Sequence, residues 1–220
     1  MKKQTLLFWC FSLLLTTGAF AQLSIGINAA YGHSWQDYGD DFYAFGRDLK
    51  IDGYTLAVSI YYDLSSNLSV GMEPGITRRG SARDPGFAWR NIYVWQGAAI
   101  YNNYVQLPLL LRGQLNLWQS NFFLSGKVGG GPAYMVSGHR QIKYWEPSQA
   151  EERQDLNFKE EQDLNRWDFG GYGGLGLGYR IGPGAIQVEA NYYYGLMDAN
   201  DQLTSKNRSL LFGLGYTFRL

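Results

Sequence analysis

The sequence predicts an all-β protein: an eight-stranded antiparallel up-and-down transmembrane β-barrel with short periplasmic turns and long extracellular loops. Apolar residues alternate with small or polar residues through eight segments, which is the period-two pattern of strands with one apolar face. The connections between these segments alternate between long and short, as they do in outer-membrane barrels. The segments also exceed the usual strand length of about five or six residues, and they suit a tilted crossing of a bilayer.

The segment 208–220 carries the clearest alternation in the chain. Its apolar face consists of Leu210, Phe212, Leu214, Tyr216, Phe218 and Leu220. Its other face consists of Ser209, Gly213, Gly215, Thr217 and Arg219, and Leu211 is the exception to the pattern. A membrane barrel needs such a strand to pair with its first strand, because an unpaired sheet edge would leave backbone groups without partners in hydrocarbon.

Composition limits the class of protein. The chain has 220 residues, a formal net charge of zero and a mean hydropathy of −0.27. A neutral chain lacks the strongly basic face expected of a nucleic-acid-binding protein. After the N-terminus there is no apolar run of about 18 residues, which excludes a helical membrane protein. A β-barrel remains compatible with these values, because alternating strands dilute their apolar residues.

Residues 1–21 are predicted to be a signal peptide, and residues 22–220 the barrel domain. Lys2 and Lys3 form the positive region, an apolar stretch follows, and Ala19-Phe20-Ala21 matches a cleavage site. The single cysteine, Cys10, lies within this segment, so the mature chain would contain no disulfide. Removal of Lys2 and Lys3 would take two from the 19 basic residues and none from the 19 acidic residues, so the mature chain would have a net charge of −2.

Eight strands and seven connections follow from the alternation. The expected strands are about 23–32, 51–63, 68–80, 99–113, 121–136, 168–180, 185–197 and 208–220. Long loops are expected at 33–50, 81–98, 137–167 and 198–207, and short turns at 64–67, 114–120 and 181–184. Pro74 and Gly75 predict a bulge or kink in the third strand.

The faces opposite the apolar ones would point into the lumen, and they carry charges of both signs. The inward charged residues are Asp63, Glu73, Arg112, Lys127, Asp168, Arg180, Glu189 and Arg219. An eight-stranded barrel is only wide enough for side chains to fill it. Four charges of each sign therefore predict a paired internal network, since a selective pore would favour one sign. An ion or proton path along these groups is the alternative.

No catalytic, cofactor or metal site is predicted. Ser137 and His139 would share a strand face near an outer loop, but no carboxylate is evident to orient the histidine. The acidic residues of the 137–167 loop lack the spacing of a calcium loop and are interleaved with basic residues, so a solvated, partly helical loop is expected. Arg78 and Arg79 are expected at the outer rim, where they could meet lipopolysaccharide phosphates or be ordinary rim charges.

Exposed aromatic residues on the long loops are the best sign of a binding surface. These residues are Trp35, Trp89, Trp95 and Trp145. Loops on a rigid scaffold often carry binding, so these tryptophans are candidates for contact with a protein partner.

Four segments carry a resemblance to a known family. They are Tyr104-Val-Gln-Leu-Pro-Leu-Leu-Leu111, Lys127-Val-Gly-Gly-Gly-Pro-Ala-Tyr134, Glu189-Ala-Asn-Tyr-Tyr-Tyr-Gly-Leu196 and Gly213-Leu-Gly-Tyr-Thr-Phe-Arg219. In these segments the chain resembles the small outer-membrane β-barrel proteins of Bacteroidota, the broad group that includes the PorT family. The resemblance implies a location in the cell outer membrane, and one branch of the group is linked to type IX secretion.

The expected function is that of a non-enzymatic, monomeric outer-membrane barrel with a filled lumen, in a structural, surface-binding or secretion-associated role. Its expected partners are outer-membrane lipid and lipopolysaccharide, together with a protein partner at the extracellular loops. A lipid A-modifying enzyme and a soluble periplasmic lipocalin-like barrel are the two alternatives. The lipocalin-like barrel would place the apolar faces inside, around a ligand.

Overall fold

The computed structural model describes residues 23–38, 48–83, 97–117, 120–143, 152–158, 164–200 and 203–220. The predicted signal peptide and the tryptophans Trp89, Trp95 and Trp145 lie outside these residues. The described strands are β1 (Leu23–Tyr38), β2 (Asp48–Leu49), β3 (Ile51–Asp63), β4 (Leu68–Met72), β5 (Gly75–Arg83), β6 (Gly97–Gln106), β7 (Leu109–Asn116), β8 (Phe122–Lys143), β9 (Glu152–Asp155), β10 (Trp167–Ile181), β11 (Gly184–Asn200) and β12 (Leu203–Arg219).

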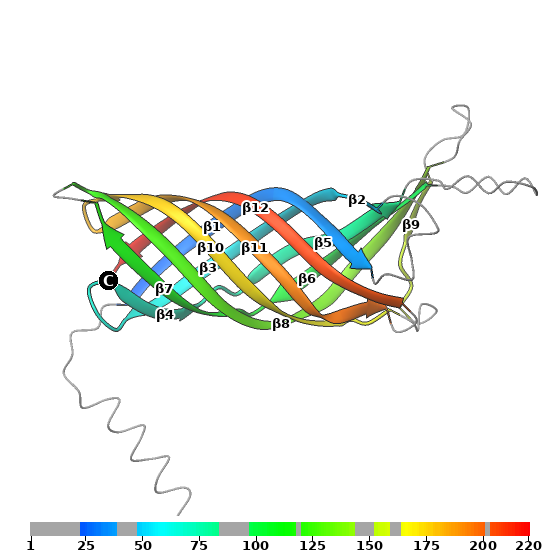
Figure 1. Cartoon of the computed structure of the whole chain (residues 1–220), viewed down its shortest axis with the longest axis horizontal. Helices are drawn as coiled ribbons and strands as arrows, with labels where there is room; N and C mark the ends of the chain where they lie inside the picture. Colours follow the sequence, from blue (N-terminus) through cyan, green and yellow to red (C-terminus); the bar gives the residue numbers. More distant parts are fainter. Residues whose placement is uncertain are drawn as a thin grey trace, which may run out of the picture.

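The strands form a closed ring of eight antiparallel wall strands, which confirms the predicted fold class (Figure 1). Two of the wall strands are interrupted, so that β4 and β5 form one of them and β6 and β7 another. The first interruption contains Pro74, as predicted, and the second contains Pro108, where the sequence predicted an unbroken strand. Proline has no amide hydrogen to donate to the neighbouring strand, which explains both breaks. Backbone bonds from Glu73 to Pro108 and from Leu107 to Pro132 connect the wall across them.

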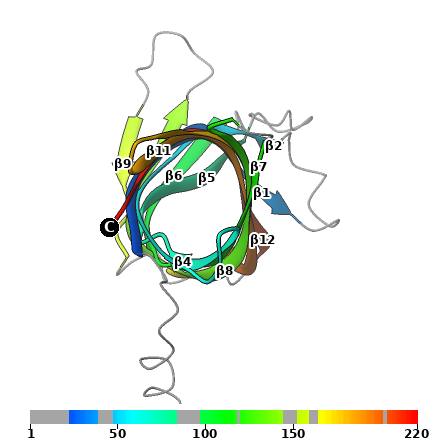
Figure 2. The same ribbon diagram turned by 90° about the vertical axis from the view of Figure 1, so that its left-hand side faces the viewer.

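Closure is made by β12 and β1, as predicted from the alternation in segment 208–220. Their pairing runs without a shift from Ser24 opposite Arg219 to Tyr38 opposite Ser205. The amide of Leu220 donates to the carbonyl of Leu23 at 2.9 Å, so the two ends of the described chain lie side by side. Viewed along the barrel, the strands form a ring around a common axis (Figure 2).

The apolar faces of the strands point outward. Three successive leucines of β7 illustrate the alternation, because Leu109 and Leu111 are 59% and 43% exposed whereas Leu110 is 3% exposed. Large apolar side chains are exposed in this way on wall strands all around the ring. Polar and charged side chains make up most of the buried set. The predicted facing is therefore confirmed, and the lipocalin-like alternative is wrong.

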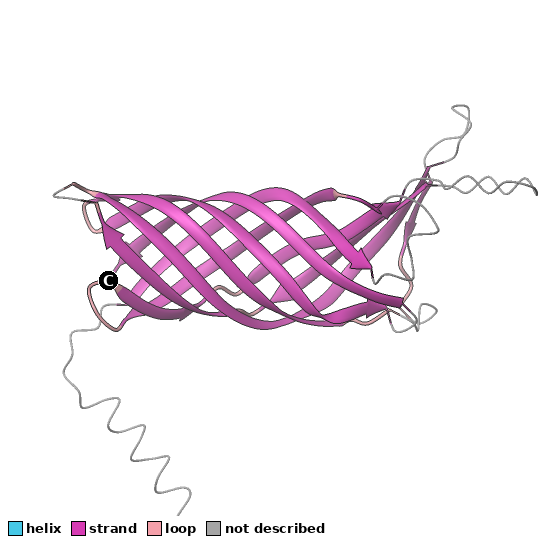
Figure 3. Cartoon of the chain, viewed as in Figure 1, coloured by secondary structure: helices cyan, strands magenta, loops and turns pink. Residues whose placement is uncertain are grey.

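Aromatic side chains mark both ends of the apolar band. Those nearer the short turns, 40–46% exposed, are Tyr62, Phe122, Tyr179, Tyr216 and Phe218. Those nearer the other end include Tyr31, Trp167, Tyr192 and Tyr194, which are 40–59% exposed. Such girdles lie at the two interfaces of a membrane. The described residues contain no helix long and apolar enough to span a membrane (Figure 3).

The wall extends further toward the long connections than the sequence predicted. Strand β1 continues to Tyr38 and β8 to Lys143, both within segments expected to be loops. The expected loop 198–207 is also mostly strand, because β11 ends at Asn200 and β12 begins at Leu203. These segments are polar on both faces, so they lack the apolar alternation that revealed the membrane-spanning parts. Their backbone ladder nevertheless continues, with Asp198 opposite Lys206.

The extension of β8 pairs with a short strand from the 137–167 connection. In that pairing His139 lies opposite Asp155, and Ile142 lies opposite Glu152. The sequence predicted a solvated and partly helical loop here, and the described part of the connection contains β9 instead. All four residues of β9 are exposed, consistent with its strongly polar composition.

Candidate functional site in the barrel lumen

A buried lysine joins two carboxylates nearer the short turns of the lumen. Lys127 Nζ lies 3.0 Å from Glu73 Oε2 and 2.8 Å from Glu189 Oε2. The three side chains are only 5–11% exposed. They come from β8, the break between β4 and β5, and β11, so the group spans the lumen. We call Lys127, Glu73 and Glu189 the lysine triad.

Neighbouring side chains satisfy the other oxygens of the lysine triad. Tyr61 donates its hydroxyl to Glu73 Oε1 at 2.8 Å, and Gln187 donates its amide to Glu189 Oε1 at 2.7 Å. The guanidinium of Arg112 stacks on the Tyr61 ring, 3.8 Å from its centroid. Charged side chains are stable in a buried, low-dielectric site only when they are paired and hydrogen-bonded in this way.

A second buried charged group lies farther along the lumen. Arg79 Nη1 pairs with Asp168 Oδ2 at 3.4 Å, and its Nη2 donates to Gln106 Oε1 at 2.7 Å. Arg79 also donates to the Tyr172 hydroxyl at 2.9 Å, and its guanidinium lies 3.5 Å from the ring centroid of Tyr193. We call Arg79, Asp168, Gln106, Tyr172 and Tyr193 the arginine cluster. Both charges are almost completely buried, at 1% and 3% exposure.

The position of Arg79 corrects the expectation that it lies at the outer rim. It follows Thr77 on the inward face of β5, and it is among the most completely buried side chains of the described residues. Extending the alternation by two residues past Thr77 would have predicted this position. The paired arginines Arg78 and Arg79 instead suggested a solvated rim, although adjacent residues of a strand point to opposite faces.

The predicted charged residues thus fall into separate groups. Glu73, Lys127 and Glu189 form the lysine triad, whereas Asp168 pairs with Arg79, which was not among them. Arg219 Nη2 lies 2.9 Å from Asp63 Oδ2 near the turn end, where Arg219 is half exposed.

Two of the predicted charges stack on rings. Arg112 contacts Tyr61, and Arg180 lies 5.0 Å from the ring centroid of Phe123. Neither forms an ion pair within the described residues, although each was expected to have a partner on a neighbouring strand.

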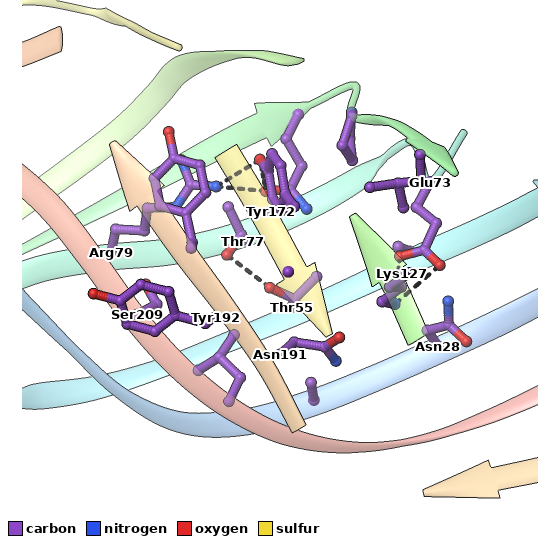
Figure 4. A pocket seen from close by; sticks show the side chains of 18 residues that line it. Asn28, Thr55, Glu73, Thr77, Arg79, Lys127, Tyr172, Asn191, Tyr192 and Ser209 are labelled. Atoms are coloured by element: carbon purple, nitrogen blue, oxygen red, sulfur yellow. Dashed lines mark hydrogen bonds and ion pairs between the residues drawn. The ribbon is translucent and has the colours of Figure 1, made fainter. Parts of the chain in front are cut away.

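A small cavity, lined by both apolar and polar side chains, separates the lysine triad from the arginine cluster. Its volume is about 60 Å³, and Figure 4 shows Thr55 and Thr77 between Lys127 at one side and Arg79 at the other. Both amide atoms of Asn28 and the Oδ1 atom of Asn191 are buried without a hydrogen-bond partner in the described protein. A single water needs at least about 10–15 Å³. The cavity therefore has the size and the polar groups to hold a few waters.

Ser137 and His139 do not form a nucleophile and base pair. Ser137 Oγ accepts a hydrogen bond from Asn103 Nδ2 at 3.0 Å, and the His139 ring stacks on Tyr101 with centroids 4.9 Å apart. Burial lowers the pKa of His139, and the positive charges of Arg153 and Arg78 lower it further. No hydrogen bond joins Ser137 to His139 in the described part of the chain. Within those same residues, no group of three or more histidine, cysteine, aspartate or glutamate side chains is arranged around a metal position.

Trp35 lies on the barrel wall near the outer end. It was expected on a long loop, and that expectation is wrong, because β1 continues past it to Tyr38. Lys50 Nζ lies 5.2 Å from the Trp35 ring centroid, and the Tyr192 ring lies 6.3 Å away. The other three candidate tryptophans lie outside the described residues.

A closed ring of eight strands with an apolar outside and a polar inside defines an integral membrane β-barrel. The chain belongs to the outer membrane protein beta-barrel domain family, whose model matches residues 20–201. The protein is therefore a small barrel of the cell outer membrane. No curated protein sequence is detectably similar to it.

Solved structures of outer-membrane proteins share the fold at low identity. The attachment invasion locus protein Ail of Yersinia pestis is 19% identical over 90% of this chain and 99% of its own, with a TM-score of 0.43. The outer membrane protein OprG of Pseudomonas aeruginosa is 12% identical over 91% and 96%, with a TM-score of 0.47. The outer membrane protease OmpT of Escherichia coli is 9% identical over 91% and 96%, with a TM-score of 0.44. At these identities the likeness is one of fold alone.

Proposed function

We propose that the protein is a non-enzymatic outer-membrane barrel whose lumen is closed to ions and whose function lies at its outer surface. The role is structural or one of binding, with outer-membrane lipid and a protein at the outer end as the partners, and a link to secretion as in PorT-like proteins of Bacteroidota. The chain acts as a monomer in this proposal. The main support for this proposal is that two buried charged groups, the lysine triad and the arginine cluster, extend across the lumen.

The lysine triad and the arginine cluster favour a plug over a conducting pore. Ion-selective pores present rings of one sign of charge to passing ions. Here Lys127 lies between two carboxylates, and Arg79 is bonded to Asp168 and Gln106. An ion would have to break these contacts, and leaving a buried charge unpaired costs about 3–5 kcal/mol.

A non-enzymatic role is supported by the contacts of the candidate catalytic residues. The Ser137 hydroxyl is bonded to Asn103, and His139 is stacked on Tyr101. Nucleophilic catalysis requires a base within hydrogen-bond reach of the nucleophile and a third group that orients the base. Ser137 and His139 instead contact side chains of the neighbouring strand β6.

Conductance across a planar lipid bilayer tests the closed lumen. The purified, refolded protein is expected to give no steady ohmic current above the background of the bilayer. A variant with Lys127→Ala, Glu73→Ala and Glu189→Ala together with Arg79→Ala and Asp168→Ala is the matched control. It removes both buried charged groups, and it is expected to conduct if it folds. A steady, ion-selective current through the wild-type protein would contradict the proposal.

A further inference from the structure

Arg78 lies on the lipid-facing side of the wall, opposite in direction to its neighbour Arg79. It shares the outward face of β5 with Ile76, which is 45% exposed. Arg78 is opposite Tyr54 in the pairing of β5 with β3, and Tyr54 is opposite Tyr31 in the pairing of β3 with β1. Because Tyr31 belongs to the outer aromatic girdle, Arg78 lies at the level of the outer membrane interface.

Two tyrosine rings and one amide hold the guanidinium of Arg78 in place. Its central carbon lies 4.8 Å from the ring centroid of Tyr54 and 5.7 Å from that of Tyr101. Its Nε donates to Asn103 Oδ1 at 3.2 Å, and the Tyr54 hydroxyl donates to the same oxygen at 3.4 Å. Asn103 is itself fixed by donating to Ser137 Oγ at 3.0 Å. The side chain is therefore oriented before any ligand arrives.

The charge of Arg78 is not balanced by the protein around it. Among the described residues, no carboxylate lies within ion-pair distance of Arg78, whereas Arg79 pairs with Asp168 and Arg208 pairs with Asp37. Only Nε of Arg78 donates to a protein acceptor in that part of the chain, which leaves both terminal nitrogens available. A fixed guanidinium with a free fork of donors is the arrangement that binds phosphate by two parallel hydrogen bonds.

We propose that Arg78, with Tyr54, Tyr101 and Asn103 as its positioning residues, binds a phosphate group of an outer-leaflet lipid of the lipid A type. The anion available at the outer interface of this membrane is a lipid phosphate, and the neighbouring apolar surface at Ile76 would contact its acyl chains. The proposal specifies the lipid partner as one that carries a phosphate group, and it rests on the outer-membrane location in the proposed function.

Titration of the folded protein in detergent micelles with bis-phosphorylated lipid A tests the site, with bound lipid counted by native mass spectrometry. Arg78→Gln is expected to weaken binding about 10-fold, the loss expected for a charge-assisted hydrogen-bonded contact. Arg78→Lys keeps the charge but lacks the forked pair of guanidinium donors, so its affinity for lipid A is expected to fall between that of the wild type and that of Arg78→Gln. Fully dephosphorylated lipid A should bind the wild-type and Arg78→Gln proteins equally. Inorganic phosphate should not displace the lipid at equal concentration, because it lacks the acyl chains.

Arg153→Gln is the matched control, because it removes the same charge from the exposed strand β9 at the same end of the barrel. It should bind phosphorylated lipid A as the wild type does, and all variants should show the same gel shift on heating as the folded wild type. Equal affinity of wild type and Arg78→Gln, or equal loss in Arg153→Gln, would overturn the proposal. These outcomes are independent of conductance, so a conducting barrel would refute the closed lumen without affecting the lipid site.

Discussion

Replacing Arg79 with methionine is expected to lower the free energy of unfolding by about 3–5 kcal/mol, because it leaves the buried carboxylate of Asp168 without its charged partner. Among the described residues, Asn207, which donates to Asp168 Oδ2 at 2.9 Å, would be the one side chain still bonded to that oxygen. The substitution also removes the hydrogen bonds that Arg79 donates to Gln106 Oε1 and to the Tyr172 hydroxyl. Tyr172 itself would still donate to Gln106 Oε1, at 3.0 Å. Urea unfolding of the reconstituted barrel, followed by tryptophan fluorescence, measures the loss.

Two further variants separate the loss of the ion pair from a general effect of the substitution. Arg153→Met changes an arginine that is 64% exposed, so it should alter the unfolding free energy by less than about 0.5 kcal/mol. Arg79→Met combined with Asp168→Asn leaves no isolated charge and should recover part of the stability. A loss of less than about 1 kcal/mol in Arg79→Met, no more than that of an ordinary substitution, would contradict the structural role of the arginine cluster.

Replacing Lys127 with methionine is expected to destabilise the barrel by a similar amount, about 3–5 kcal/mol. The lysine separates Glu73 and Glu189, and both carboxylates contact its ammonium group at about 3 Å. Without it, two buried like charges would face each other across the lumen, and like charges oppose ionisation of the pair. The unfolding free energy at neutral pH is again the quantity to measure.

The matched variant removes the carboxylates as well. Lys127→Met together with Glu73→Gln and Glu189→Gln has no unpaired charge, and amides can still accept from Tyr61 and donate to neighbours. This triple variant is expected to be more stable than Lys127→Met alone. If it is less stable, and the three losses simply add, then the lysine triad is not a coupled group.

The membrane-spanning wall was predictable because its residues follow a simple alternation. Leu109, Leu110 and Leu111 are chemically identical, yet their neighbours along the strand set which of them faces lipid. Successive side chains of a strand point to opposite faces, so once the lipid-facing residues are identified, the residues between them must point into the lumen. The closing pair of strands followed from the same pattern in 208–220, and the break at Pro74 followed from the missing amide hydrogen.

The outer end of the barrel was not predictable in the same way. Above the membrane both faces of a strand contact water or polar groups, so segments such as 33–38 and 203–207 carry no apolar alternation. Their strand structure comes from ladder hydrogen bonds with neighbours that are already in place. The polar composition of these segments therefore predicts loops, although the structure continues the strands of the wall through them.

The pairing of charged side chains within the lumen also could not be predicted from the sequence. Alternation places Asp168 and Lys127 inside, but which charges meet depends on the stagger of strands around the closed ring. Asp168 on β10 pairs with Arg79 on β5, which is not a neighbouring strand. A search limited to adjacent strands could not find this pair.

Lipid accessibility of the three successive leucines of β7 tests the central claim of an apolar outside and a polar, closed inside. The mature chain is expected to lack cysteine, so Leu109→Cys, Leu110→Cys and Leu111→Cys can each carry a single nitroxide label in reconstituted barrels. Collisions with oxygen dissolved in the lipid, measured by electron paramagnetic resonance, should be frequent at 109 and 111 and rare at 110. Frequent collisions at 110 with rare ones at 109 and 111 would invert the facing and contradict the account.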